Sequence, residues 1–224
     1  MPRLILFDLD GTLIDTAPEL AHAVNTLLQR IGRPPVPLAQ VRAWIGRGAR
    51  ELLRQALQHH EPGGVAAPAV DAAWPAFEQD CIDACGTHST PYAGVVTTLD
   101  TLHAQGRHLA LVTNKEGALT RRLLMRHQLT HCFDLIVAGD TLPVRKPDAA
   151  VLRHALETFG VDAADALFIG DSAIDVQAAR NAGVPVWAVS YGYDRAGLTG
   201  PHAPDRLIDS VSVLLDQLPR IAIA

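Results

Sequence analysis

Five short apolar runs punctuate the chain, and stretches with helical periodicity separate most of them. The runs are Leu4–Phe7, Leu109–Thr113, Asp134–Gly139, Ala166–Gly170 and Val184–Ser190. Short apolar runs of this kind are typical of parallel strands that are buried on both faces. Apolar periodicity predicts helices over Gly117–His127, Ala149–Phe159, Ile174–Ala182 and, near the end, about Val211–Leu218. Strands and helices that alternate in this way predict an α/β protein with a doubly wound, Rossmann-like parallel sheet.

The segment 17–86 breaks this alternation. It shows helical patterns at Glu19–Ile31, Leu38–Trp44, Ala49–His59 and Val70–Asp83, and the proline- and glycine-rich clusters "GRPPVP" and "EPGGVAAPA" separate them. We therefore expect an α/β core formed by residues 1–16 and 87–224, with residues 17–86 inserted as a helical cap. The hinges of this cap are expected near Thr16–Pro18 and Thr87–Pro91.

Polar side chains gather where the predicted strands end. In chain order they are Asp8 and Asp10, then Thr113, Asn114 and Lys115, then Lys146 in the loop "TLPVRKPD", then Asp171, Ser172 and Asp175. In an open parallel sheet these loops meet at one edge, and ligands bind there at the topological switch point. The sequence therefore predicts a site that is rich in carboxylates and contains a lysine.

Carboxylates packed this closely need a cation to offset their repulsion. A hard, oxygen-preferring ion such as Mg²⁺ fits the donor set, and it commonly shares its coordination sphere with a substrate phosphate. Lys146 and Thr113 would then supply a positive charge and a neutral donor for phosphoryl oxygens. Taken one by one, the same acids could be turn formers or helix caps.

Composition narrows the classes of partner. The 224 residues carry a formal charge of −5 with acids and bases interspersed, which predicts neither a nucleic-acid footprint nor a membrane surface. The three cysteines have no framework spacing and no signal-peptide pattern is evident, so we expect buried free thiols in a cytoplasmic protein, either monomer or homodimer. Lys115 and Lys146 are the only lysines beside 17 arginines, which suggests positions where an ammonium is preferred over a guanidinium fork.

At this point the sequence resembles the haloacid dehalogenase superfamily of phosphatases. "FDLDGTLIDT" is similar to the family's first motif, "LVTN" to the second, "RKPD" to the third and "FIGDSAIDVQAARNAG" to the fourth. The four motifs follow one another in family order and span most of the chain. The resemblance implies a haloacid-dehalogenase-like core and a Mg²⁺-dependent phosphomonoesterase that acts on a small phosphorylated metabolite.

The resemblance also implies a role for each residue. Asp8 would be the nucleophile that forms an aspartyl-phosphate, and Asp10 would be the general acid/base. The metal site would comprise Asp8, the Asp10 backbone carbonyl, Asp171 and, through water or by holding Lys146, Asp175. The residues implied to contact or enclose the phosphate are Thr113, the Asn114 amide, Lys146, Gly11 and Thr12. Asp15, beyond the turn, is expected to serve the hinge.

The cap stretch "VRAWIGRGARELLRQAL" resembles that of bacterial phosphoglycolate phosphatases, which implies 2-phosphoglycolate as substrate. Arg47 in this stretch could bind a substrate carboxylate or be a solvated loop residue. Sugar phosphates, muramic acid 6-phosphate, pyrophosphate and nucleotides remain alternative substrates. A hexose-phosphate mutase is disfavoured because Leu20 stands where mutases carry a histidine, although His22 is close by. A phospho-accepting signalling module is disfavoured by Asp10 and by the cap.

Overall fold

The computed structural model describes residues 2–61 and 63–218. Its centre is a parallel six-stranded sheet in the order β5-β4-β1-β6-β7-β8. The strands are β1 (Leu4–Phe7), β4 (His108–Val112), β5 (Leu135–Val137), β6 (Ala166–Gly170), β7 (Val186–Val189) and β8 (Arg206–Ile208). This arrangement confirms the predicted α/β class and the doubly wound sheet.

Strand β1 marks the topological switch point. It lies between β4 and β6, with Phe7 in register with Leu111 on one side and with Ile169 on the other. The chain extends the sheet outward from β4 to β5 and from β6 to β8, in opposite directions. The crevice at the carboxyl end of β1 is therefore where a ligand site is expected, and Asp8 is the residue that follows this strand.

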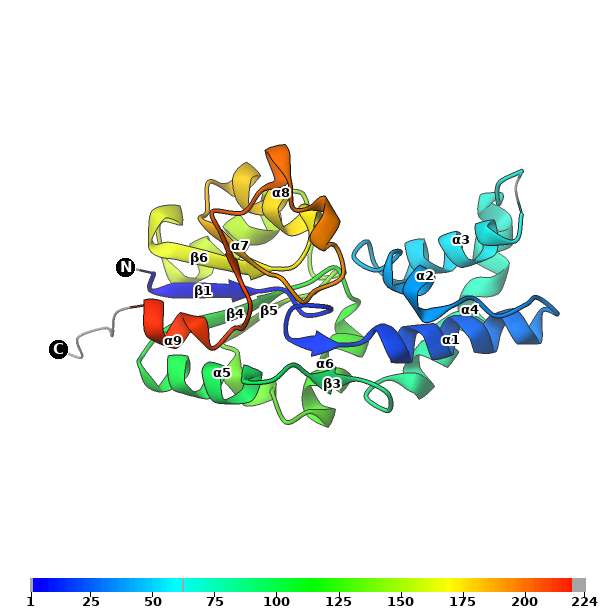
Figure 1. Cartoon of the computed structure of the whole chain (residues 1–224), viewed down its shortest axis with the longest axis horizontal. Helices are drawn as coiled ribbons and strands as arrows, with labels where there is room; N and C mark the ends of the chain where they lie inside the picture. Colours follow the sequence, from blue (N-terminus) through cyan, green and yellow to red (C-terminus); the bar gives the residue numbers. More distant parts are fainter. Residues whose placement is uncertain (1, 62, 219–224) are drawn as a thin grey trace.

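Helices cover both faces of the sheet (Figure 1). One face carries α5 (Val95–Ala104), α6 (Gly117–Arg126) and α9 (Val213–Gln217), and the other carries α7 (Ala150–Phe159) and α8 (Ala173–Ala182). Successive side chains of β1 point to opposite faces, because Ile5 and Phe7 belong to one buried cluster while Leu4 and Leu6 belong to the other. All four side chains are fully buried, which explains why this strand is apolar throughout.

Four helices stand together beyond the carboxyl end of β1 (Figure 1). They are α1 (Ala17–Arg30), α2 (Leu38–Arg42), α3 (Ala49–His59) and α4 (Ala67–Ala84), and α1 packs against the other three. Helix α4 begins three residues before the predicted start, with a proline in its first turn, where a missing N–H costs nothing. The division of the chain at residues 17 and 86 stays a prediction.

The two connections to these helices lie side by side. Strand β2 (Ile14–Asp15) pairs with β3 (Thr90–Pro91) in antiparallel fashion, so both crossings are fastened to each other. Asp15 accepts hydrogen bonds from the Ala17 N–H at 3.3 Å and the Tyr193 hydroxyl at 2.8 Å, and pairs with Arg42 at 3.3 Å. These contacts hold Asp15 at this crossing, and its role in a hinge stays a prediction.

Two elements depart from the sequence analysis. Helix α5 is not among the predicted helices, because its first turn is rich in β-branched residues that favour strands. Its buried residues Val95, Thr98, Leu99 and Leu102 nevertheless follow helical spacing, so tertiary packing outweighs propensity. The edge strand β8 is three residues long and two of them are exposed, which leaves no apolar run to detect. Short 3₁₀ turns occur at Thr130–Cys132, Ala163–Asp165, Arg195–Gly197 and Gly200–His202.

Candidate active site

The loop after β1 turns tightly around the carboxylate of Asp171. The Asp8 N–H donates to the Ile169 carbonyl of β6 at 2.9 Å, which extends the strand pairing by one residue. Gly11 has a φ of +89°, and a Cβ there would lie 2.4 Å from Oδ2 of Asp171. The Thr12 hydroxyl donates to Oδ1 of Asp171 at 3.2 Å. Glycine is therefore required both for the backbone conformation and for the close approach.

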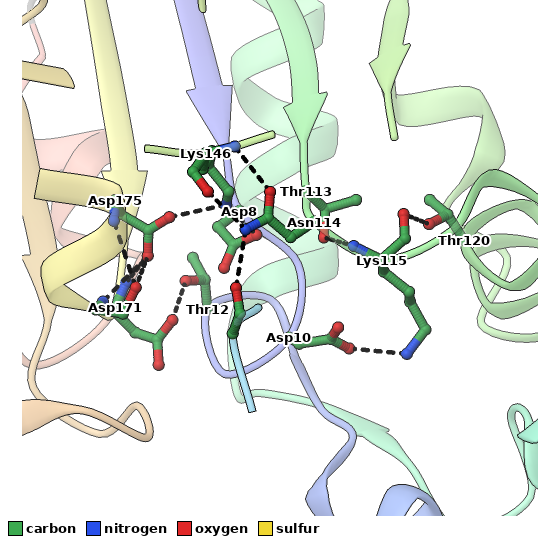
Figure 2. A network of polar contacts seen from close by, with 12 residues as sticks. Asp8, Asp10, Thr12, Thr113, Asn114, Lys115, Thr120, Lys146, Asp171 and Asp175 are labelled. Carbon is green, nitrogen blue, oxygen red and sulfur yellow. Dashed lines mark hydrogen bonds and ion pairs between the residues drawn. The ribbon is translucent and has the colours of Figure 1, made fainter. Parts of the chain in front are cut away.

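Lys146 enters the site from the loop after β5. The side-chain amide of Asn114 fixes its backbone, since Oδ1 accepts from the Lys146 N–H at 2.9 Å and Nδ2 donates to its carbonyl at 3.1 Å. The Lys146 Nζ lies 2.6 Å from Asp8 and 2.8 Å from Asp175 (Figure 2). Burial opposes its charge, but the carboxylates of Asp175 and Asp8 outweigh burial and raise the pKa of Lys146. Lys146 is therefore held as an ammonium against the predicted nucleophile.

The turn after β6 orients two further acids. Ser172 caps helix α8, and Asp175 reaches back to accept from the Ser172 hydroxyl at 2.6 Å and from its N–H at 3.1 Å. The other oxygen of Asp175 is bound to Lys146, so Asp175 positions the lysine. Asp171 accepts from the Tyr193 N–H at 2.6 Å. Both acids are almost fully buried.

The acids are more numerous than Lys146 can balance. Oxygens of Asp8, Asp171 and Asp175 lie within 4.8 Å of one another. Burial raises the pKa of Asp8 to about 7, and burial together with the charges of Asp175 and Asp8 raises that of Asp171. Such shifts show that the ionised carboxylates lack compensation. An all-oxygen donor set beside an oxyanion site fits Mg²⁺ better than a softer ion.

Asp10 turns its side chain away from this acidic cluster. Its Oδ1 accepts from the Thr16 hydroxyl at 2.7 Å and lies 3.2 Å from the Nζ of Lys115. In Figure 2, Asp171 and Asp175 lie on one side of Asp8, and Asp10 and Lys115 lie on the other. The position of Asp10 suits proton transfer at the leaving-group side of a phosphate bound at Asp8.

Lys115 is a residue of the site to which the sequence analysis assigns no role. It is buried, and although burial opposes its charge, the carboxylates of Asp10 and Glu19 outweigh burial and raise its pKa. The sequence held a signal, since both lysines of this arginine-rich chain follow strands and both occupy the site. Tyr193 is also absent from the prediction. It contacts Asp171 through its backbone N–H, which no side-chain pattern reveals, and its hydroxyl contacts Asp15.

A cavity of about 450 Å³ separates the core loops from the helices beyond them. The core side contributes Asp8, Asp10, Thr113, Asn114, Lys115, Glu116 and Leu119, and the helical side contributes Leu20, Ile45, Gly46, Gly48, Ala49 and Leu52. The Asn114 amide also donates to the Gly46 carbonyl at 2.9 Å, which ties the loop before α3 to the core. This volume includes space that is open to solvent.

The structure brings the predicted residues together with one exception. Asp8, Asp10, Thr113, Asn114, Lys146, Asp171 and Asp175 converge as expected, and Gly11 lies against Asp171. Arg47 is exposed and lines a separate surface hollow with Arg50 and Arg54. A carboxylate contact by Arg47 therefore stays a prediction that this arrangement does not favour. The side-chain amide of Asn114 is hydrogen-bonded to the backbone of Lys146 and Gly46, so a phosphate contact by this side chain also stays a prediction.

Comparison with known proteins agrees with this site. Residues 5–189 match the family model described as haloacid dehalogenase-like hydrolase. Phosphoglycolate phosphatase 1 of Pseudomonas aeruginosa is 42% identical over 216 residues, which cover 96% of this chain and 79% of the relative. The plasmid-encoded phosphoglycolate phosphatase of Cupriavidus necator is 43% identical over 94% of this chain and 90% of the relative. The crystal structure of a predicted phosphoglycolate phosphatase from Haemophilus somnus superimposes with a TM-score of 0.89 at 31% identity, covering 96% and 97% of the two chains.

The chain belongs to the haloacid dehalogenase-like hydrolase family. Within that family it is a phosphatase, a phosphoric monoester hydrolase, and it acts on a small phosphorylated substrate. Among the helices of residues 2–61 and 63–218, none combines the length and apolar character of a membrane span. Cys81, Cys85 and Cys132 are buried and free, as expected.

Proposed function

We propose that this protein hydrolyses 2-phosphoglycolate to glycolate and phosphate, with Mg²⁺ as cofactor and an aspartyl-phosphate on Asp8 as intermediate. The observation that carries the proposal is the placement of Asp8 at the switch point, between the ammonium of Lys146 and the cavity. The named relatives support the choice of substrate. The free cysteines support a reducing, cytoplasmic setting.

The residues divide the reaction between them. The phosphate would lie against Asp8 and Lys146, with the Thr113 hydroxyl at the same strand edge to donate to its oxygens. Oδ2 of Asp8 would attack phosphorus in line while Asp10, on the leaving-group side, protonates the departing oxygen. Asp10 would then remove a proton from the water that hydrolyses the acyl phosphate. Asp10 is bound to Thr16 and Lys115 in this structure, so its side chain would have to rotate toward Asp8 for both acids to flank one phosphorus.

The residues that would hold Mg²⁺ are Asp8, Asp171 and the backbone carbonyl of Asp10, with Asp175 fixing Lys146 beside them. When bound, the ion would supply positive charge that offsets the charge of the phosphoryl oxygens. The Tyr193 N–H and the Thr12 hydroxyl keep Asp171 oriented toward this position.

The lining of the cavity supports a short leaving group. The helical side contributes apolar side chains and two glycines, and these offer no side-chain partners for the hydroxyls of a sugar. Leu20 lines the cavity where the mutases carry a histidine, and an apolar side chain relays no proton. His22, the possible substitute, contacts His88 with the two rings tilted by 54°, and it lines a different hollow with Thr26. These observations weigh against sugar phosphates and against a mutase.

The test is kcat/KM for phosphate release across 2-phosphoglycolate, hexose phosphates, muramic acid 6-phosphate, pyrophosphate and nucleotides. We expect 2-phosphoglycolate to lead by at least about tenfold, which corresponds to roughly 1.4 kcal/mol. A smaller lead, or a lead by another ester, would refute this substrate. Loss of activity on chelation and recovery with Mg²⁺ tests the cofactor.

A further inference from the structure

The cavity is lined by a basic side chain to which the proposed phosphate chemistry gives no role. Among the described residues that line it, Lys115 is the one with a basic side chain. Lys146 is not among the residues that line the cavity, and its ammonium is bound by Asp8 and Asp175. Arg47 lines a hollow on another part of the surface. A second negative charge on a ligand in this cavity would therefore meet Lys115.

Lys115 is well placed for a ligand that extends beyond Asp10. Its Nζ is 3.2 Å from Oδ1 of Asp10, on the side of Asp8 opposite to Asp171 (Figure 2). Asp10 protonates the leaving oxygen in the proposed reaction. In 2-phosphoglycolate the carboxylate stands two bonds from that oxygen, so a leaving oxygen beside Asp10 brings the carboxylate into the neighbourhood of Lys115.

The surroundings of Lys115 leave its charge available. Asp10 forms the salt bridge, but Thr16 also binds the same oxygen of Asp10, so Asp10 has a partner of its own when Lys115 changes contacts. Glu19 is the other nearby acid, and its carboxylate accepts from the Gly86 N–H at 2.7 Å.

We propose that the ammonium of Lys115 binds a carboxylate on the leaving group and so selects phosphorylated short hydroxy acids over neutral phosphate esters. This inference rests on the proposed function and names the residue that recognises the carboxylate of the proposed substrate. On binding, the substrate carboxylate takes the place of Asp10 beside Lys115. One of the two groups that hold Asp10 is thereby withdrawn, and Asp10 is released toward the leaving oxygen.

The decisive experiment compares 2-phosphoglycolate with 2-phosphoglycolamide, its neutral isostere. The ratio of kcat/KM for acid over amide is measured for the natural enzyme, Lys115→Met and Lys115→Arg. We expect a ratio of about 10 to 100 for the natural enzyme, in line with a charge-assisted hydrogen bond. In Lys115→Met the ratio should fall to about 1. Lys115→Arg, which keeps the charge, should recover part of the preference and shows that any loss is not a failure to fold.

Several outcomes overturn the inference. An unchanged ratio in Lys115→Met, with both rates lowered by one factor, would mean that Lys115 acts through Asp10 alone. If instead the acid-over-amide ratio of kcat/KM fell to about 1 in Arg47→Ala, Arg47 would be the residue that binds the carboxylate. These results leave the proposed function standing, because the natural enzyme still turns over 2-phosphoglycolate.

A binding measurement, which requires no turnover, distinguishes failure of the Lys115 site from failure of the proposed substrate. The affinity of 3-phosphonopropionate, a non-hydrolysable methylene analogue, is compared with that of its amide by calorimetry in the presence of Mg²⁺. The natural protein should bind the acid about tenfold or more tightly than the amide, and Lys115→Met should bind both alike. Equal affinities in the natural protein would refute the Lys115 site. Absence of 2-phosphoglycolate turnover beside a Lys115-dependent preference for the acid would refute only the substrate.

Discussion

The ammonium nitrogen of Lys146 lies 2.6 Å from Oδ1 of Asp8, and both residues are buried. An unbalanced carboxylate at this depth would favour its protonated form and would be a poor nucleophile. Lys146 opposes this effect by lowering the pKa of Asp8, although burial still raises that pKa to about 7, and Asp175 and Asn114 in turn hold Lys146 in place. The predicted nucleophile depends on residues that follow three other strands.

Lys146→Met should damage both stability and catalysis. The substitution leaves Asp8 and Asp175 without their buried cation, which costs about 3 to 5 kcal/mol. At roughly 2 to 4 °C per kcal/mol for a chain of this size, the melting temperature should fall by about 10 °C. Calorimetry at about pH 7.5 and kcat/KM measure the two effects. A variant as stable as the natural protein would contradict the pairing.

The pH dependence of the free energy of unfolding should show the raised pKa of the buried carboxyl of Asp8. Burial raises the pKa of Asp8 to about 7 from 3.8, so between these values the folded protein binds more protons than the unfolded chain. The free energy of unfolding without metal should therefore decrease as pH rises through this window. Mg²⁺ favours the ionised form, so it should raise the melting temperature more at about pH 7.5 than at about pH 5. An equal effect of Mg²⁺ at both pH values would contradict this account.

Gly48→Ala tests whether the loop before α3 must approach the core. Gly48 has a φ of +89°, and a Cβ there would lie 2.5 Å from Nη1 of Arg145 and 3.2 Å from the Asn114 carbonyl. We expect KM to rise about tenfold, because the loop is pushed away from the cavity.

Gly64→Ala is the matched control for Gly48→Ala. Gly64 has a φ of +88°, and a Cβ there meets nothing within 4 Å. Both variants place an alanine at a positive φ, so each should lose at least about 1 kcal/mol of stability through backbone strain. A rise in KM of equal size in the two variants would show that strain, and not closure, is responsible.

Tyr193→Phe should separate the hinge from the metal site. The hydroxyl accepts from the N–H groups of Thr16 and Ala17 at 2.7 and 2.9 Å, whereas the backbone N–H holds Asp171. Removing the hydroxyl should lower the free energy of unfolding by about 1 to 3 kcal/mol, because the Thr16 N–H loses its acceptor and the Ala17 N–H keeps only its 3.3 Å contact with Asp15. Mg²⁺ affinity, measured by calorimetry, should change by less than about threefold. A large loss of Mg²⁺ affinity would show that the hydroxyl also orients Asp171.

The sequence predicts those parts of the site that follow directly from strands. Asp8, Thr113 and Asp171 each come immediately after an apolar run, and the convergence of parallel strand ends places them together. The sequence places Lys115 at the strand ends but assigns it no role, since its contacts depend on the path of a loop. Tyr193 is not predicted, since it acts on Asp171 through a backbone N–H. The chemistry of Arg47 suggests a carboxylate ligand, but its position depends on the loop between Gly46 and Gly48, whose positive φ values no periodicity reveals. Helix α5 shows the same limit, because its packing against the sheet outweighs residues that favour strands.

The central claim is that Asp8 becomes phosphorylated during turnover. The most direct measurement is acid quench of the enzyme within the first turnovers of 2-phosphoglycolate, followed by mass spectrometry of the peptide that contains Asp8. We expect a phosphoryl adduct on Asp8 that decays as phosphate is released, and an Asp8→Asn variant that folds but forms no adduct and releases no phosphate. Substantial turnover by Asp8→Asn, or an adduct located on another residue, would contradict the account.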